Sequence, residues 1–164
     1  MRWKAAVVTV SDRCCQGIRE DVTGSKLVDM LKQEGYDVVD VRIVPDERDQ
    51  IAKVLRELCD VSKCDLVVTN GGTGVSPRDV TPEATRDVIE REVPGIAEAM
   101  RAESLKKTPH AMLSRAVVGI RGETLIVNLP GSPKGAIENF EVIKHAIPHA
   151  LEKIHGDPSE CAVK

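Results

Sequence analysis

Aromatic side chains are almost absent from this chain, whose 164 residues include one Trp, one Tyr and one Phe. The core must therefore be aliphatic, and stacking of nucleic-acid bases on aromatic rings is disfavoured. The net charge is −3, so no basic field favours a nucleic-acid partner. No apolar run approaches the roughly 18 residues that span a bilayer, and we expect no membrane segment.

Cysteine occurs in a pattern that argues against two common uses. The number is odd and no C-x-x-C spacing occurs among the five residues Cys14, Cys15, Cys59, Cys64 and Cys161. Neither a disulfide framework nor a zinc site is indicated. The N-terminus also lacks a signal-peptide pattern. We therefore expect free thiols in a cytoplasmic protein.

The composition, 41% hydrophobic and 30% charged, is that of a soluble globular protein. We expect one domain over residues 1–156 and a flexible C-terminal tail over 157–164. Short apolar runs predict strands at 5–10, 38–44, 66–69, 117–120 and 124–127. Helical spacing predicts helices at 25–34, 49–59, 81 to about 91, 96–105, and from 133 toward 154 with a disturbance at Pro148.

Strands alternate with helices along the chain, which favours an α/β fold with a mainly parallel sheet covered on both faces. The last two strands form either a hairpin or two consecutive sheet strands. In parallel sheets the ligand lies outside the carboxyl ends of the strands. The segments that would converge at that edge are 11–13, 45–46, 70–79 and 128–134.

Residues 69–82 form the most informative segment. Three glycines, Gly71, Gly72 and Gly74, follow a buried strand and allow the backbone to approach a phosphate closely. Thr81 is expected to cap the next helix, with Pro82 at its first position. The spacing matches neither a Walker A loop nor G-x-G-x-x-G, which disfavours a classical NAD fold. An ordinary tight turn is the alternative interpretation.

The segment 131–134 is a second candidate anion site. Ser132 is expected to cap a helix that starts at Pro133, and Lys134 adds a positive charge to the free N–H groups there. Alone, this pattern is typical of an ordinary helix cap. Together with the glycine-rich turn, it favours a ligand that carries more than one phosphate.

Three aspartates, Asp12, Asp46 and Asp79, fall at predicted strand ends or loops. Carboxylates repel phosphates unless a divalent cation lies between them, and Mg²⁺ suits such a site. Taken singly, each aspartate is more typical of a turn or a cap. The candidates to anchor a phosphate or to neutralise a leaving group are Arg13, Arg78 and Arg115, although each is equally typical of a surface.

Read in order, the chain contains Thr-Val-Ser-Asp-Arg (9–13), Val-Pro-Asp-Glu (44–47), Gly-Gly-Thr-Gly (71–74), Arg-Asp-Val-Thr-Pro-Glu-Ala-Thr (78–85), Leu-Ser-Arg (113–115) and Asn-Leu-Pro-Gly-Ser-Pro-Lys (128–134). With these motifs it resembles the molybdopterin adenylyltransferases of molybdenum cofactor biosynthesis. These are the MogA/MoaB proteins, which are related to the G domain of gephyrin. The resemblance covers about residues 5–156.

The resemblance implies a three-layer α/β sandwich with a mainly parallel central sheet, usually assembled as a homotrimer. It implies Mg²⁺-dependent transfer of AMP from ATP to the terminal phosphate of molybdopterin, with release of pyrophosphate. It also implies that the product passes to a molybdenum insertase.

Roles for individual residues follow from the same resemblance. The family's acidic pair falls on Asp46 and Asp79, which would hold the metal and act in catalysis. The phosphate-binding turn falls on Gly71, Gly72, Thr73 and Gly74, and a contact with the molybdopterin phosphate falls on Ser114. The other residues that would line the nucleotide and pterin pocket are Ser11, Asp12, Asn128, Pro130 and Gly131. Arg115 and Ser132, introduced above, complete the set of candidate binding residues.

Two other functions compete with this one. The MoaB branch shares the fold but varies at the acidic positions, so a protein that binds molybdopterin without catalysis is the first alternative. The presence of both Asp46 and Asp79 favours the catalytic branch. A flavodoxin-like redox protein is the second alternative, and the scarcity of aromatics that would sandwich a flavin argues against it. The Cys14-Cys15 pair matches no family motif.

Overall fold

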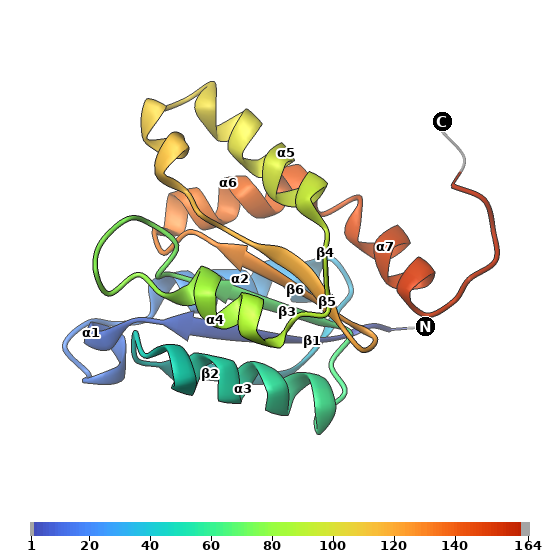
Figure 1. Ribbon diagram of the computed structural model, residues 1–164, viewed down its shortest axis with the longest axis horizontal. Helices are drawn as coiled ribbons and strands as arrows, with labels where there is room; N and C mark the ends of the chain where they lie inside the picture. The colour runs from blue at the N-terminus through green and yellow to red at the C-terminus, as the bar shows by residue number, and fades with distance from the viewer. Residues whose placement is uncertain (1, 162–164) are drawn as a thin grey trace.

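The computed structural model describes residues 2–161, which form a six-stranded sheet flanked by helices (Figure 1). The strands are β1 (Lys4–Val10), β2 (Asp37–Val44), β3 (Leu66–Asn70), β4 (Arg91–Glu92), β5 (Val118–Arg121) and β6 (Thr124–Leu129). The helices are α1 (Asp12–Cys15), α2 (Val22–Gln33), α3 (Arg48–Asp60), α4 (Thr81–Val88), α5 (Pro94–Leu105), the 3₁₀ helix η1 (Pro109–Leu113), α6 (Pro133–Ile143) and α7 (Ile147–Ile154).

The sheet is mainly parallel, as the alternation of strands and helices predicted. Its strand order is β2-β1-β3-β6-β5-β4, and the pairs β1–β2, β1–β3 and β3–β6 are parallel. The strands β5 and β6 form an antiparallel hairpin in which Arg121 pairs with Thr124. Of the two arrangements left open by the sequence, the hairpin is therefore the one adopted.

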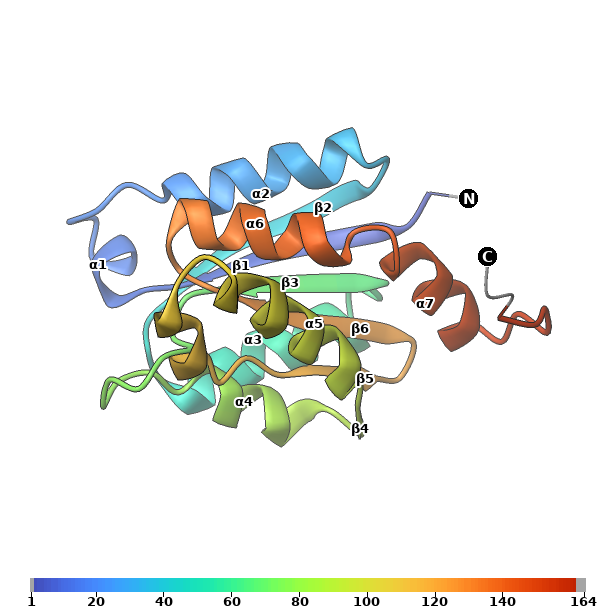
Figure 2. The ribbon, with the colours of Figure 1, turned by 90° about the horizontal axis from the view of Figure 1, so that it is seen from above.

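Helices cover both faces of the sheet (Figure 2). Side chains alternate along β1, so Ala5 and Val7 face one core, whereas Ala6 and Val8 face the other. The first core is closed by α2, α5, α6 and α7, and the second by α3 and α4. The predicted three-layer α/β fold is confirmed, and its four parallel strands end at one edge.

The helix predicted from Thr81 to about Arg91 differs from α4 at both ends. The prediction placed its C-terminus too far along the chain and assigned the N-cap to the wrong residue. Helix α4 ends at Val88, because the next backbone donors turn to the neighbouring strand: Glu90 N and Val93 N each donate to β5 at 2.8 Å. The N-cap residue is Val80, and Thr81 is the first helical residue. The Thr81 hydroxyl instead donates to the Gly71 carbonyl at 2.9 Å.

Other helix boundaries also differ from the predictions. The helix expected from 133 toward 154 is broken over residues 144–146, and Pro148 lies in the first turn of α7, where no N–H is needed. Helix α2 begins before the expected residue 25, because the Asp21 carboxylate accepts from Gly24 N at 2.9 Å. No helix was predicted at the positions of the short helices α1 and η1.

The C-terminal segment is described as far as Cys161, so residues 162–164 of the expected flexible tail lie outside the described residues. Gly156, at φ 88°, follows α7, and Ser159 N donates to Asp157 at 2.9 Å. Flexibility of the tail remains a prediction. Among residues 2–161, no helix is both long enough and apolar enough to cross a membrane.

Candidate functional site

The segments expected at the carboxyl edge of the sheet converge on a cavity of about 730 Å³, called here the large cavity. Its lining combines the ends of β1 and β3, the loop after β2 and the start of α6. The residues are Thr9, Val10, Ser11, Cys14, Arg19, Glu20, Asp21, Val22, Thr23, Asp46, Asn70, Gly71, Gly72, Asp79, Gly131, Ser132 and Pro133. Ser11, Asp46, Asp79 and the two loop glycines therefore lie together, as predicted from the sheet topology.

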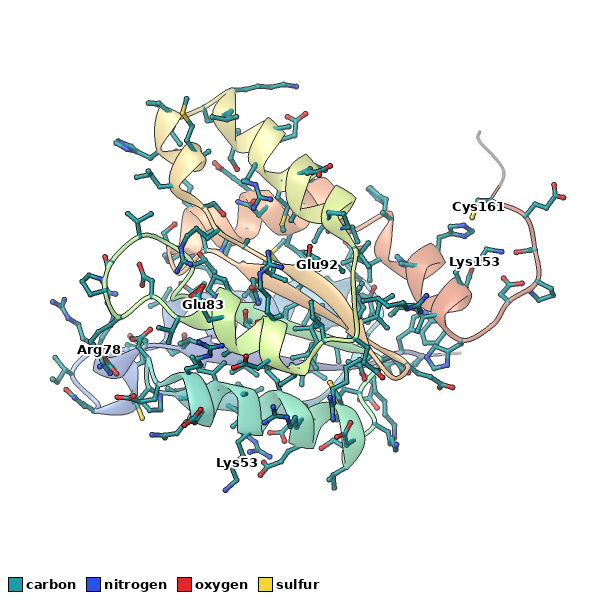
Figure 3. All side chains as sticks on the ribbon, viewed as in Figure 1. Lys53, Arg78, Glu83, Glu92, Lys153 and Cys161 are labelled. Carbon is teal, nitrogen blue, oxygen red and sulfur yellow. The ribbon has the colours of Figure 1, made fainter. Side chains whose placement is uncertain are left out.

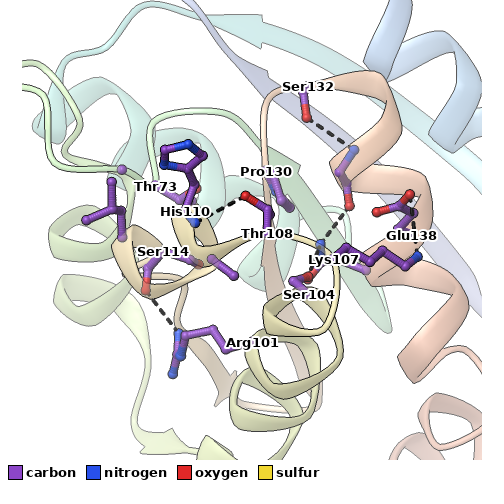
Figure 4. Close-up of a pocket in the computed structure, with 15 residues that line it drawn as sticks. Thr73, Arg101, Ser104, Lys107, Thr108, His110, Ser114, Pro130, Ser132 and Glu138 are labelled. Atoms are coloured by element: carbon purple, nitrogen blue, oxygen red, sulfur yellow. Dashed lines mark hydrogen bonds and ion pairs between the residues drawn. The ribbon is translucent and has the colours of Figure 1, made fainter.

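A second cavity of about 290 Å³, called here the small cavity, is shown in Figure 4, and it adjoins the large cavity. The two share Ser132, and the glycine-rich turn runs between them, with Gly71 and Gly72 lining the large cavity and Thr73 and Gly74 the small one. The predicted residues Ser114 and Pro130 also line the small cavity. The turn and the start of α6 therefore contribute to both cavities.

The glycine-rich turn is shaped by close packing of three strand ends. Gly71 has φ +97° and Gly72 φ +68°, a backbone region that favours glycine. A Cβ on Gly71 would overlap the Val10 carbonyl, and a Cβ on Gly131 would lie 3.2 Å from Gly71 Cα. Gly71 N donates to Leu129 O at 3.1 Å, so this amide is not free for a phosphate. Gly71 is therefore a packing residue in the wall of the large cavity.

The acidic residues form a connected group. Asp12 N donates to Asp46 Oδ2 and Asp46 N donates to Asp12 Oδ1, both at 3.0 Å. Arg78 Nε donates to Asp12 Oδ2 at 2.7 Å, which lowers the pKa of Asp12. Burial, followed by the charges of Asp12 and Asp79, raises the pKa of Asp46 above its usual range. Asp46 and Asp79 thus face one cavity in mutual repulsion, which a cation would relieve.

The donor set fits Mg²⁺ held jointly with a substrate. Asp79 Oδ2 accepts from Ser76 N at 2.9 Å and Asp46 Oδ2 accepts from Asp12 N, and in residues 2–161 the other oxygen of each carboxylate makes no hydrogen bond. Within the same residues, no group of three or more His, Cys, Asp or Glu side chains is arranged to hold a metal. Mg²⁺ is commonly bound by one or two carboxylates, water and phosphate oxygens, so a carboxylate pair suffices.

The small cavity is lined by basic side chains that no motif indicated. Arg101, Lys107 and His110 lie around it, with Glu138 as the acidic residue in its wall (Figure 4). Lys107 pairs with Glu138 at 3.4 Å, and Arg101 Nη1 donates to Ala116 O at 3.0 Å. Arg101 comes from α5, Lys107 from the turn after α5, His110 from η1 and Glu138 from α6. For Lys107 and His110 the only signal in the sequence is the polar stretch at 106–110, which does not indicate a site.

Further lining residues were missed at the other end of the site. Asp21 accepts from the Thr9 hydroxyl at 2.7 Å, and Asn70 Nδ2 donates to the same hydroxyl at 3.0 Å. The Thr23 hydroxyl donates to Gly131 O at 2.8 Å. These contacts tie the start of α2 to the ends of β1, β3 and β6, and so shape the wall of the large cavity.

Asn128 was predicted to line the ligand pocket, but the structure places it below both cavities. Its side chain is fully buried and lies in neither cavity. Its Nδ2 donates to the hydroxyls of Thr69 and Thr85 at 3.0 Å, and its Oδ1 accepts from Val117 N at 3.0 Å. With donors and acceptor satisfied by protein, Asn128 joins β6 to β3, α4 and β5 below the site.

Arg115 was predicted to bind a ligand phosphate, but its guanidinium is occupied by the protein. Nε donates to Gly74 O and Nη2 to Asp79 O, each at 2.7 Å, while Nη1 pairs with Glu83 Oε2 at 2.6 Å. Arg115 N also donates to Thr73 O at 2.8 Å. Arg115 therefore holds the two ends of the loop that carries Asp79.

Glu83→Gln is expected to destabilise the protein by about 1 kcal/mol at pH 7, because it breaks a partly exposed bidentate pair with Arg115. Arg115 lowers the pKa of Glu83 below its ordinary 4.5. The folded protein thus binds this proton less readily than the unfolded chain, so the pair stabilises above pH 4.5 and its contribution disappears as the pH falls through the lower folded pKa. Urea unfolding at neutral and strongly acidic pH checks this prediction. The difference in unfolding free energy between Glu83→Gln and the wild type should disappear in acid, and an unchanged difference would contradict it.

The fold and the site together define an α/β protein with a large cavity at the carboxyl edge of a mainly parallel sheet, the edge at which such sheets generally bind ligands. A family model described as "Probable molybdopterin binding domain" matches residues 6–149. The chain belongs to this molybdopterin-binding family.

Individual relatives cover nearly the whole chain. A Helicobacter pylori (strain J99) protein named molybdopterin adenylyltransferase is 45% identical over 153 residues, which are 92% of this chain and 87% of that protein. Gephyrin of Dictyostelium discoideum is 43% identical over 95% of this chain, which spans 23% of that longer protein. A crystal structure of the molybdopterin biosynthesis enzyme MoaB from Thermus thermophilus is 49% identical, with a TM-score of 0.89 over 96% of this chain and 99% of that one.

Proposed function

We propose that this protein is a molybdopterin adenylyltransferase, which transfers AMP from ATP to the terminal phosphate of molybdopterin and releases pyrophosphate. The observation that carries the proposal is the pair of adjoining cavities, which share Ser132 and have Asp46 and Asp79 in the wall of one. Two substrates that react with each other need binding sites that meet. Relatives that are 41–46% identical to the chain bear this enzyme name.

The charges in the large cavity favour ATP together with Mg²⁺. Its ionisable lining consists of Glu20, Asp21, Asp46 and Asp79 against Arg19, with Cys14 as a thiol. An unaccompanied polyphosphate would be repelled by this excess of carboxylates, whereas a nucleotide bound to a divalent cation would be attracted. We therefore assign ATP to the large cavity, with Asp46 and Asp79 as the residues that hold Mg²⁺.

The small cavity has the opposite balance and is assigned to molybdopterin. Arg101, Lys107 and His110 line it against Glu138, and the Ser114 hydroxyl adds a neutral hydrogen-bonding group. Such a lining suits a phosphate attached to a larger, less polar ring system. The terminal phosphate would then lie toward Ser114 and the glycine-rich turn, next to the large cavity.

The protein's contribution to the reaction is mainly the orientation of the two substrates. A terminal phosphate oxygen of molybdopterin attacks the α-phosphorus of ATP, and the new P–O bond forms as the bond to pyrophosphate breaks. The residues of the turn 71–74 keep the attacking and receiving groups in adjoining cavities. Bound Mg²⁺ would supply charge neutralisation for the departing pyrophosphate. No covalent enzyme intermediate is required.

The alternative of a non-catalytic molybdopterin-binding protein is less well supported. The name MoaB does occur among similar structures, at 49% identity, but that protein is itself described as an enzyme. Both aspartates of the acidic pair are present and face one cavity. A protein that only bound molybdopterin would not need two carboxylates that repel each other in the wall of the large cavity.

The assay that tests the proposal incubates the protein with Mg-ATP and molybdopterin. Adenylylated molybdopterin and pyrophosphate are expected in equal amounts. Mass spectrometry detects the first product, and a coupled assay measures the second. Reactions without molybdopterin, and with a chelator added, serve as controls and should give neither product. Binding of molybdopterin without any adenylylated product at saturating substrates would favour the non-catalytic alternative.

We further propose a homotrimer in the cytoplasm that passes its product to a molybdenum insertase, as the family resemblance implies. Edge strand β2 leaves Val41 49% and Ile43 44% exposed, and an apolar sheet edge favours cover by a second chain. All five cysteines are free thiols, in keeping with a reducing compartment. Light scattering would give the mass of the assembly relative to the 17.8 kDa chain.

A further inference from the structure

Arg78, which is labelled in Figure 3, bonds residues of two other loops at the edge of the candidate site. Its Nε donates to Asp12 Oδ2 at 2.7 Å, and its Nη2 donates to Asp12 Oδ1 at 3.2 Å and to Glu47 Oε1 at 2.9 Å. Asp12 follows β1, Glu47 follows β2, and Arg78 follows β3. A single guanidinium thus connects the carboxyl ends of three neighbouring parallel strands.

The contacts continue from Arg78 through Asp12 to Asp46. Asp12 and Asp46 exchange two hydrogen bonds of 3.0 Å between the backbone N–H of one and the carboxylate of the other. Asp46 Oδ2 is held by this exchange, which leaves Oδ1 for another partner. The Asp12 carboxylate therefore holds the backbone N–H of Asp46 in the loop after β2.

The position of Arg78 does not suit direct contact with a substrate. Neither Arg78 nor Asp12 lines the large or the small cavity, whereas Asp46 and Asp79 line the large one. The sequence suggested Arg78 as a phosphate anchor, but the structure places it behind the acidic pair. It is also the cation that offsets the charges of Asp12 and Glu47 next to Asp46.

We propose that Arg78 is a positioning residue that fixes Asp46 through Asp12, so that the free oxygen of Asp46 is oriented toward the cation of a bound nucleotide. This inference rests on the proposed function, because a fixed Asp46 orientation matters only if Asp46 holds a cation. A planar guanidinium is required, since it bonds both carboxylate oxygens of Asp12 and one oxygen of Glu47 at once, which an ammonium group does not reproduce.

The chain offers a matched control in Arg48. Its side chain is 53% exposed, close to the 57% of Arg78, and it also forms a two-point ion pair, with both bonds to Asp87 at 2.7 Å. It lines neither cavity. Arg48→Ala therefore removes a comparable exposed ion pair without touching the acidic group.

The experiment titrates Mn²⁺, as a paramagnetic substitute for Mg²⁺, into the whole protein with α,β-methylene-ATP, an analogue that cannot transfer AMP. Free Mn²⁺ is followed by electron paramagnetic resonance. Arg78→Ala is expected to weaken Mn²⁺ binding by roughly 10–100-fold, as loss of a residue that orients a metal ligand does. Arg78→Lys should recover part of this loss, and Arg48→Ala should stay within about twofold of the wild type. Molybdopterin affinity should be unchanged in all three variants.

The outcomes separate the inference from the proposed function. The inference alone would be overturned if the wild type binds Mn²⁺ with the nucleotide and Arg78→Ala binds Mn²⁺ no more weakly than Arg48→Ala does. A wild-type protein that fails to bind Mn²⁺ with the nucleotide would overturn the proposed function and this inference with it. If Arg78→Ala does not fold, Arg78→Lys provides the test. A Mn²⁺ affinity of Arg78→Lys equal to that of the wild type would also overturn the positioning role of Arg78.

Discussion

Replacing Asp46 or Asp79 by Asn is expected to lower AMP transfer by roughly 100-fold, because each change removes one of the two charges that would hold the nucleotide's cation. Asn keeps an oxygen that can accept the hydrogen bond now made by Asp12 N or Ser76 N, so the loops should keep their conformation. The effect should therefore appear in turnover and in Mg²⁺ dependence. Steady-state rates of pyrophosphate release, measured across Mg²⁺ concentrations, check it.

The control for this pair is Asp29→Asn. Asp29 is an exposed carboxylate on α2 that lines neither cavity, so its change should leave turnover and Mg²⁺ dependence as in the wild type. Molybdopterin should still bind to both active-site variants, because its proposed cavity does not include Asp46 or Asp79. Full activity in both variants would remove the acidic pair from the mechanism.

Elements defined by local patterns were predictable from the sequence. The apolar runs that became β1 and β3 are buried on both faces, and Ser132 caps α6 by accepting from Gly135 N at 3.1 Å, as expected. Elements that depend on a distant partner were not predictable. The helix predicted from Thr81 was expected to reach about Arg91, yet Arg91 and Glu92 pair with β5, because a sheet edge was available for their backbone.

The candidate site divides in a similar way. Motif residues such as Asp46 and Asp79 could be placed at the sheet edge, because the ends of parallel strands must meet there. The roles of Arg115 and Asn128 could not be read correctly, since a polar side chain gives no sign of whether its partners are ligand or protein. The basic residues of the small cavity were missed because α5, η1 and the turn between them have no recognisable motif, and only the packing of these segments brings the residues to the site.

Gly71→Ala is expected to destabilise the fold by about 3 kcal/mol. Alanine would be strained in the backbone conformation of Gly71, and its Cβ would overlap a backbone carbonyl that is fixed in the sheet. Gly71 has φ +97°, and a Cβ there would meet the Val10 carbonyl in β1, which cannot rotate away as a side chain can. For a chain of this size the melting temperature should fall by roughly 6–12 °C. Thermal unfolding followed by circular dichroism measures it. Activity should be lost as well, because β1 and β3 would separate at the wall of the large cavity.

Gly95→Ala is the matched control, since it introduces the same methyl group without either penalty. Gly95 lies in the first turn of α5 with no atom within 4 Å of its added Cβ, and its φ is not in the left-handed region. Alanine there should leave stability unchanged or raise it by up to about 1 kcal/mol, because alanine is the better helix former. Equal melting temperatures for the two variants would mean that Gly71 is not required for close approach of the strand ends. The contrast between them therefore separates the packing role of the glycine-rich turn from a general sensitivity to added methyl groups.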